Sequence, residues 1–286
     1  MQSSDPKKNA KVLLQSFLLA SCLALCLAAI GPQPARAEHE VVDGVKWVYE
    51  LADGKAVLNA YAVPRSTEGT VMVPARLGGC PVTEVGDYAF FDCGRITRVV
   101  LPKGVTRIGE HAFQNCTSLE SVELPDSLED MEGFYIFMDC TALKSVSLPP
   151  KLEMLGGYAF FGCSALESVA WPESLLEIGQ SAFSHCTSLK EVRFPPRLEK
   201  IRSYAFCECD SLRTLVFPES LAIIQEKAFY SCTALQELVF PESLESIGDD
   251  AFLNTGLKCV TVLGEPEGDR TIWGLPKACE LVGPPR

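Results

Sequence analysis

The sequence predicts a repeat solenoid of the α/β type, made mostly of strands and short turns, with a β-hairpin capping its N-terminal end. Internal periodicity is the first observation that predicts this fold. A Phe recurs at intervals of 23 residues, with one interval of 24. The eight positions are Phe90, Phe113, Phe137, Phe160, Phe183, Phe206, Phe229 and Phe252.

Two further residue types keep the same register. A Cys lies three residues after the Phe in seven copies, and Thr255 takes its place in the eighth. These are Cys93, Cys116, Cys140, Cys163, Cys186, Cys209 and Cys232. A Pro follows each strand-like run, at Pro102, Pro125, Pro149, Pro172, Pro195, Pro218 and Pro241. One such unit cannot bury its own apolar side, so we expect the units to stack on one another.

The elements of one unit follow from its residues. The segment from Leu119 to Leu124 reads L-x-x-V-x-L, and its last residues alternate as in a half-buried strand. The Pro after it cannot donate to a ladder and ends the strand. The A-F-x-x-C segment is too short for a full helix and predicts a single helical or 3₁₀ turn. A tight bend is predicted where Gly recurs, at Gly109, Gly156, Gly179 and Gly248.

The unit resembles a known bacterial repeat. The run Cys186-Thr-Ser-Leu-Lys-Glu-Val-Arg-Phe-Pro195 is similar to the strand segment of leucine-rich repeats, and the run from Ser243 to Phe252 completes the unit. Over residues 70–262 the chain resembles the BspA-like (Treponema pallidum-type) leucine-rich repeat family. That resemblance implies a curved solenoid on a bacterial surface, with a role in adhesion or in binding host or matrix proteins. It brings no catalytic residues. Because Pro-x-Ser replaces the usual Asn or Cys after the strand, we expect no asparagine ladder.

Residues 1–37 read as a secretory signal peptide. Lys7, Lys8 and Lys11 precede an apolar run, and Ala35-Arg-Ala37 has the small residues of a cleavage site. Two alternatives stay open. The apolar run approaches the length of a retained membrane anchor, and Leu19-Ala-Ser-Cys22 resembles a lipobox that would place a lipid on Cys22. The favoured cleavage follows Ala37 and leaves 11 of the 13 cysteines.

The remaining domain boundaries follow from the ends of the repeats. Residues 38–69 contain two strand-like runs around Asp53-Gly54 and predict a capping hairpin. The repeats then occupy residues 70–262, with an insertion at 78–81. Residues 263–286, rich in Gly and Pro, form a C-terminal cap or tail. Solenoid ends expose sheet edges, which is why caps are expected there.

The repeated cysteines are expected to be reduced and buried. Equivalent residues of stacked units lie about 4.8 Å apart, but their Cβ vectors are parallel, which is poor geometry for a disulfide. Buried Cys also behaves as a small hydrophobe. Bridges or metal sites are the alternative. Cys259 and Cys279 are the candidate disulfide, and Cys80 lacks an obvious partner.

Composition excludes several function classes. A formal net charge of −12 disfavours binding to nucleic acids and to anionic membranes. His39, His111 and His185 are the three histidines, and the two in the repeats replace residues that vary among copies. No catalytic or phosphate-binding motif is present. We therefore expect no enzyme activity, no catalytic or metal-binding residues and no cofactor.

Function is expected to reside on an extended surface. On a leucine-rich strand, the residues between the apolar ones face the concave side. We predict ligand contacts there from Glu191, Arg193, Val216, Glu237 and Val239; the alternative is that they simply form a solvated sheet. A second row follows each Phe and is either core or an interaction patch: Phe91, Gln114, Met138, Phe161, Ser184, Cys207, Tyr230 and Leu253.

These observations predict an exported protein that binds a protein or glycan ligand. Secretion or display at the bacterial cell surface is favoured, with the periplasm or a lipid anchor as alternatives. No membrane span is expected after cleavage. A structural envelope scaffold and, less favoured, a binding module that assists an enzyme are the rival functions. The ligand, the mode of attachment and the oligomeric state stay open.

Overall fold

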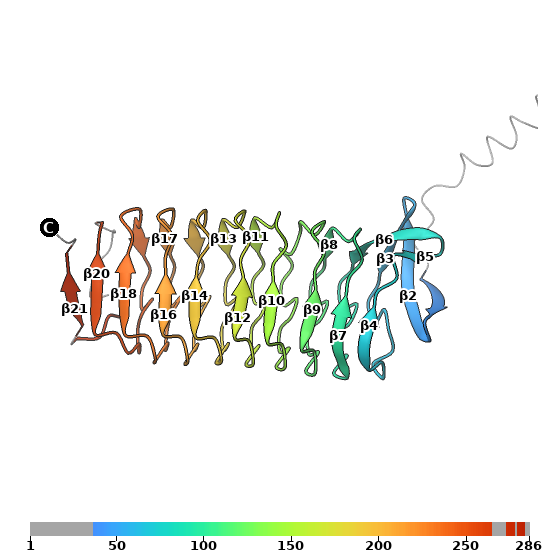
Figure 1. Ribbon diagram of the computed structural model, residues 1–286, viewed down its shortest axis with the longest axis horizontal. Coiled ribbons are helices and arrows are strands. Elements are labelled where there is room, and N and C mark those ends of the chain that lie inside the picture. The colour runs from blue at the N-terminus through green and yellow to red at the C-terminus, as the bar shows by residue number, and fades with distance from the viewer. Residues whose placement is uncertain (1–36, 265–272, 278, 284–286) are drawn as a thin grey trace, which may run out of the picture. The chain divides into compact units, whose positions relative to one another are not determined.

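The computed structural model describes residues 37–264, 273–277 and 279–283. The predicted signal peptide therefore lies outside the described residues except for Ala37, and the predicted C-terminal cap is described in part. Repeated turns stack in chain order, each contributing a strand to a shared face (Figure 1). The predicted solenoid of strands and short turns is confirmed.

A first ladder of parallel strands runs along the stack, as the L-x-x-V-x-L pattern predicts. The strands are hydrogen-bonded as four separate sheets that follow one another along this face, and within one of them Val146 lies opposite Val169. Such valines point inward, so one side of most of these strands joins the core, whereas the last strand is exposed at all three residues. The strands are β4 (Gly69–Met72), β7 (Ile96–Val100), β9 (Ser121–Glu123), β10 (Ser145–Ser147), β12 (Ser168–Ala170), β14 (Glu191–Arg193), β16 (Thr214–Val216), β18 (Glu237–Phe240), β20 (Cys259–Val262) and β21 (Glu280–Val282).

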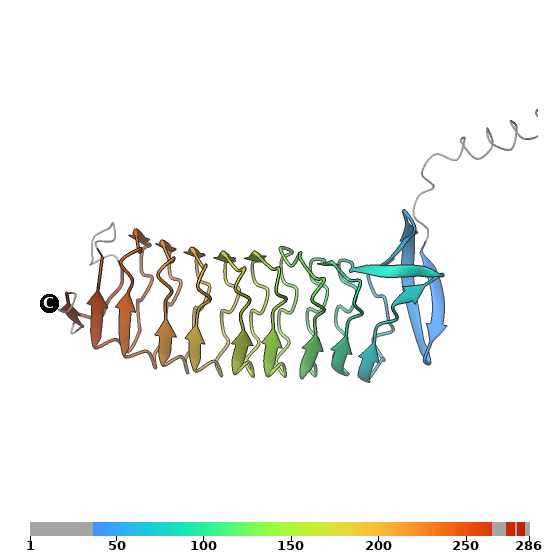
Figure 2. The same cartoon turned by 45° about the horizontal axis from the view of Figure 1, so that its top comes forward.

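A second parallel ladder, which the sequence analysis did not predict, is formed by two-residue strands at the recurring Ile-Gly position (Figure 2). It begins where β6 (Cys80–Val85) pairs with β8 (Arg107–Ile108). Two isolated bridges, Arg107 with Asp130 and Met131 with Leu155, then connect it to the following strands. The strands are β8 (Arg107–Ile108), β11 (Met154–Leu155), β13 (Glu177–Ile178), β15 (Lys200–Ile201), β17 (Ile223–Ile224) and β19 (Ser246–Ile247).

Gly recurs at these positions because the backbones of successive turns approach one another closely there. The predicted bend does not itself require Gly. None of the four has a positive φ. A Cβ on Gly156 would lie 2.2 Å from the carbonyl oxygen of Gly133, and one on Gly179 would lie 2.6 Å from that of Leu155. Such distances are far inside van der Waals contact, so Gly lets successive backbones pack closely.

The A-F-x-x-C segment forms two consecutive turns, each closed by the hydrogen bond between residues three apart that a 3₁₀ turn also has, and neither turn extends into a helix. No helix occurs among the described residues. In one copy, Phe161 N donates to Tyr158 O and Cys163 N donates to Phe160 O, both at 3.2 Å. Tyr158 and Gly162 have φ values of 56° and 72°. In each repeat unit, two residues with left-handed backbone conformation reverse the direction of the chain, so a helix cannot continue through the segment.

The recurring Phe side chains form one continuous stack in the core. Successive rings lie 4.8–5.4 Å apart and within 11° of parallel. At the N-terminal end Trp47 meets Phe90 edge-on at 79°, and near the C-terminal end Trp273 meets Phe240 at 82°. Trp47 thus lies edge-on to the first ring of the stack, and Trp273 lies edge-on to Phe240, which in turn contacts the last ring of the stack, Phe252, at 5.4 Å.

All seven repeated cysteines are buried free thiols. From the second copy onward, each Sγ donates to the Phe carbonyl oxygen of the preceding turn at 3.2–3.3 Å. In the eighth copy Thr255 donates instead to Phe252 O of its own turn, at 2.8 Å. Burial raises the pKa of Cys93 to about 12, and it also raises the pKa of Cys140, Cys163, Cys186, Cys209 and Cys232. The column thus joins successive turns by S–H···O bonds.

Serines of the Pro-x-Ser segment join the turns in the same direction. Their hydroxyls donate to main-chain carbonyl oxygens of the preceding turn at 2.7–2.8 Å. The donors are Ser127, Ser174, Ser220 and Ser243, and the acceptors are Val105, Leu152, Leu198 and Leu221. This serine column occupies the segment where other leucine-rich repeats carry Asn.

An antiparallel sheet lies before the repeats. β1 (Glu38–Val42), β2 (Val45–Ala52) and β3 (Lys55–Leu58) are consecutive, and the predicted Asp53-Gly54 turn connects the last two. β3 then pairs in parallel with β6, which joins this sheet to the second ladder. Gly78 and Gly79 of the insertion form the turn between β5 (Arg76–Leu77) and β6, and Cys80 and Pro81 are the first residues of β6. That the hairpin acts as a cap stays a prediction.

Candidate binding surface

The solvent side of the first ladder carries all five predicted contact residues. Strand alternation places Val192, Leu215 and Leu238 in the core, and their neighbours on β14, β16 and β18 point to solvent. Glu191, Arg193, Val216, Glu237 and Val239 are all exposed. Whether they contact a ligand stays a prediction.

The geometry of these residues combines apolar surface with charge. Arg193 lies opposite Val216 in the pair β14–β16, and β18 follows as the next strand (Figure 1). Val216 and Val239 are 40% and 51% exposed. Arg193 Nε lies 2.5 Å from Glu191 Oε1, so the two charges are paired on the same strand. A partner would meet two exposed valines beside an ion pair and the carboxylate of Glu237.

The same face continues toward both ends. Its middle is small and polar, with Ser145, Ser147, Ser168 and Ala170 exposed. Sequence reasoning missed two exposed apolar residues, Met72 on β4 and Val282 on β21. Strand alternation in Val71-Met-Val73 could have identified the first; the second lies in a segment that was interpreted as a tail.

The second predicted row lies at the boundary of the core. Ser184 and Cys207 are buried, and the other six residues are half-buried. Ser184 Oγ donates to Cys207 O at 3.1 Å, which ties these two buried positions together. This row is therefore neither wholly core nor a freely exposed patch.

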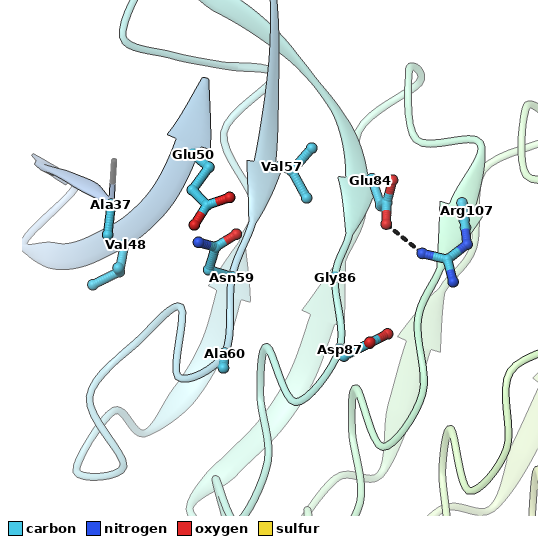
Figure 3. Close-up of a pocket in the computed structure, with 10 residues that line it drawn as sticks. All are labelled: Ala37, Val48, Glu50, Val57, Asn59, Ala60, Glu84, Gly86, Asp87 and Arg107. Atoms are coloured by element: carbon cyan, nitrogen blue, oxygen red, sulfur yellow. Dashed lines mark hydrogen bonds and ion pairs between the residues drawn. The ribbon is translucent and has the colours of Figure 1, made fainter. Parts of the chain in front are cut away.

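A pocket of about 470 Å³, lined by both polar and apolar side chains, lies beside the N-terminal sheet (Figure 3). Glu50, Asn59 and Asp87 line it, together with the ion pair between Glu84 and Arg107. Arg107 also pairs with Asp130 at 3.1 Å. Within the described ranges, no three His, Cys, Asp or Glu side chains are grouped so as to hold a metal ion. The pocket offers hydrogen bonds and charge to a polar ligand.

The candidate disulfide partners lie on neighbouring turns as free thiols. Cys259 opens β20 opposite Glu280 of β21, and Cys279 immediately precedes that Glu280. Burial, and secondarily the nearby Cys259, raises the pKa of Cys279. The disulfide stays a prediction. Cys80, half-buried on β6, is also free.

Comparisons with known proteins agree with the repeat geometry. The model of the BspA type leucine rich repeat region matches in six copies, over residues 83–175 and 154–266. A solved leucine-rich repeat protein of T. pallidum is 26% identical with a TM-score of 0.57, over 86% of this chain and 92% of that one. One from Bacteroides ovatus is 25% identical with a TM-score of 0.48, over 89% and 78%.

No curated protein matches the chain. In the part of the chain that the structure describes, no helix is long and apolar enough to cross a membrane.

Proposed function

Because this chain belongs to the family of BspA type leucine-rich repeat proteins, we propose that it is an exported binding protein without enzyme activity. Its ligand is a protein or a glycan, and it binds on the solvent side of the first ladder. Adhesion at the bacterial cell surface is the role that this binding serves. The signal-like N-terminus, with Lys7, Lys8 and Lys11 before an apolar run, supports export.

One observation carries the binding proposal: Val216 and Val239 are both exposed at equivalent positions of consecutive turns. An exposed valine pair on a regular sheet costs solvation free energy that a bound partner would recover. Charged neighbours border the pair, with Glu237 on the same strand as Val239 and Arg193 opposite Val216. An apolar centre with a polar rim is the usual anatomy of a protein interface.

The test is a pull-down of extracellular host and matrix proteins, run beside a glycan array, with the mature chain as bait. Val216→Asp combined with Val239→Asp should weaken capture at least about tenfold, because it places carboxylates against the apolar centre. Val41→Asp is the matched control, since Val41 is an exposed valine (66%) on β1, away from this face. Circular dichroism verifies that each variant is folded.

Unchanged capture by the double variant would reject this face as the ligand site. Self-association of the purified chain without any ligand would favour the scaffold function instead. Export is tested separately by sequencing the N-terminus of the protein recovered outside the cytoplasm, which should begin at Glu38.

A further inference from the structure

A continuous row of aromatic and imidazole rings lies on the turns that flank the core Phe stack. We call it the aromatic band: Tyr61, Tyr88, Phe91, His111, Phe134, Tyr135, Tyr158 and Phe161. Neighbouring rings of the band have centroids 4.5–6.4 Å apart. It crosses the N-terminal half of the stack and is separate from the solvent side of the first ladder.

The backbone of the turns creates this row. Tyr88, His111, Tyr135 and Tyr158 hold the same position in successive turns, with φ between 55° and 64°. Such values are uncommon for residues other than Gly. Their rings stack at 4.5, 4.7 and 4.8 Å. His111, expected to be a solvated substitution, is instead half-buried between two tyrosines and lies 2.5 Å from Gln114 Oε1 through Nδ1.

The band is partly exposed. Tyr61 and Phe134 are 49% and 45% exposed, and Tyr88 is exposed as well, whereas the other five rings are half-buried. Phe134 lies over Gly157, where a Cβ would come within 2.7 Å of its ring. The absence of a side chain at Gly157 therefore leaves the space that this exposed ring occupies. Contiguous exposed aromatic surface on a soluble protein commonly marks an interaction site.

The surroundings of the band are acidic. Asp87 and Glu110 precede Tyr88 and His111 in the chain, and Glu110 N donates to Asp87 Oδ1 at 2.8 Å. Asp139 lies beside Phe161, donating its main-chain N–H to Phe161 O at 2.8 Å. The chain as a whole carries a formal net charge of −12. Aromatic faces and carboxylates both attract cations.

The protein's own cations already use this chemistry at the N-terminal end of the band and beyond its C-terminal end. Arg65 lies 5.1 Å from the centroid of Tyr61 and 5.9 Å from that of Phe91. Farther along, Lys227 lies 5.5 Å from the ring of Tyr204, which occupies the same turn position as the stacked tyrosines. Among the described residues, no Lys or Arg lies over the rings between these two sites.

We propose that the centre of the aromatic band binds arginine and lysine side chains of a basic segment of a partner protein. The cation rests against Phe134 and Tyr135, whose ring centroids lie 6.0 Å apart. The carboxylate of Glu110 supplies charge from the neighbouring turn, where His111 donates its main-chain N–H to Phe134 O at 3.0 Å. Arginine is favoured over lysine, because its planar guanidinium stacks on aromatic rings and is more weakly hydrated.

The test is titration of the purified protein with a fluorescein-labelled peptide of alternating arginine and glycine, eight residues long. A glutamate-glycine peptide of the same length is the ligand control. Phe134→Ser combined with Tyr135→Asn removes the central rings, and Asn tolerates the positive φ at position 135. We expect the arginine peptide to bind, and the double variant to weaken binding about tenfold, the equivalent of two exposed cation–π contacts.

Val41→Ser is the matched protein control, because it removes an exposed apolar side chain from β1, outside both the band and the first ladder. Binding that persists in Val41→Ser and falls on raising the salt concentration supports the proposal. Absence of arginine-peptide binding at low salt would overturn it. Equal losses in Val41→Ser and in the band variant, or no loss in the band variant, would also overturn it. Ligand capture by the first ladder is measured separately, so either proposal can fail alone.

Discussion

Raising the pH above about 9 should destabilise this protein through its buried thiols. Five of them are wholly buried, and burial raises the pKa of each: Cys140, Cys163, Cys186, Cys209 and Cys232. The unfolded chain releases these protons near the ordinary pKa of 9.0, whereas the folded chain keeps them. Stability is therefore fully present below pH 9 and is lost as the pH rises toward the raised folded pKa values.

The magnitude follows from proton linkage. At pH 10, ionisation of one unfolded thiol favours the unfolded state by about 1.4 kcal/mol. Five thiols together contribute about 7 kcal/mol on the same basis, which is comparable with the whole stability of an ordinary domain, about 5–15 kcal/mol. The protein should thus be close to unfolding at pH 10.

The assay is urea denaturation at pH 8 and pH 10 in the presence of a reductant, followed by circular dichroism. Cys163→Ala removes one thiol, so its loss of stability between the two pH values should be smaller than that of the wild type by about 1.4 kcal/mol. Titration of lysine and tyrosine side chains affects the stability of both proteins equally, so it cancels when the variant is compared with the wild type. An equal loss in both proteins would refute the reasoning.

Three further predictions concern the packing, and each is tested by urea denaturation. Gly156→Ala should lower the free energy of unfolding by more than about 2 kcal/mol, because its Cβ would overlap the backbone of the preceding turn. Gly283→Ala is the control and should be neutral, because no atom lies within 4 Å of the added Cβ. Equal effects of the two variants would contradict the close-approach argument. Phe183→Ala should lower the free energy of unfolding by about 3–5 kcal/mol because it opens the ring stack. A loss below about 1 kcal/mol would contradict this expectation. Ser174→Ala should cost about 1 kcal/mol; no loss would remove the serine column as a stabilising feature.

The stack and its buried side could be predicted from the sequence because they depend only on side-chain periodicity. Phe160, Cys163 and Pro172 keep their spacing in the first seven copies, and equivalent residues of stacked turns must coincide. The exposure of Val216 and Val239 followed from the same alternation. These predictions needed no knowledge of the path between the periodic residues.

The backbone path between the periodic residues could not be predicted. A strand of two residues, such as Glu177–Ile178, is too short to show alternation, so the second ladder left no pattern to recognise. Tyr158 is an uncommon residue for a positive φ, so its turn conformation was not apparent either. The aromatic band depends on that conformation, because only stacked left-handed positions align the rings of Tyr135 and Tyr158.

The thiol and serine columns also bear on how the number of turns can change. Their acceptors are main-chain carbonyl oxygens, which every turn possesses whatever its sequence. Duplication or loss of a whole unit of 23 residues therefore leaves no donor without an acceptor. Even across the one interval of 24 residues, Cys140 Sγ keeps its bond to Phe113 O at 3.2 Å. The stack can lengthen or shorten by unequal recombination without redesign of its interior.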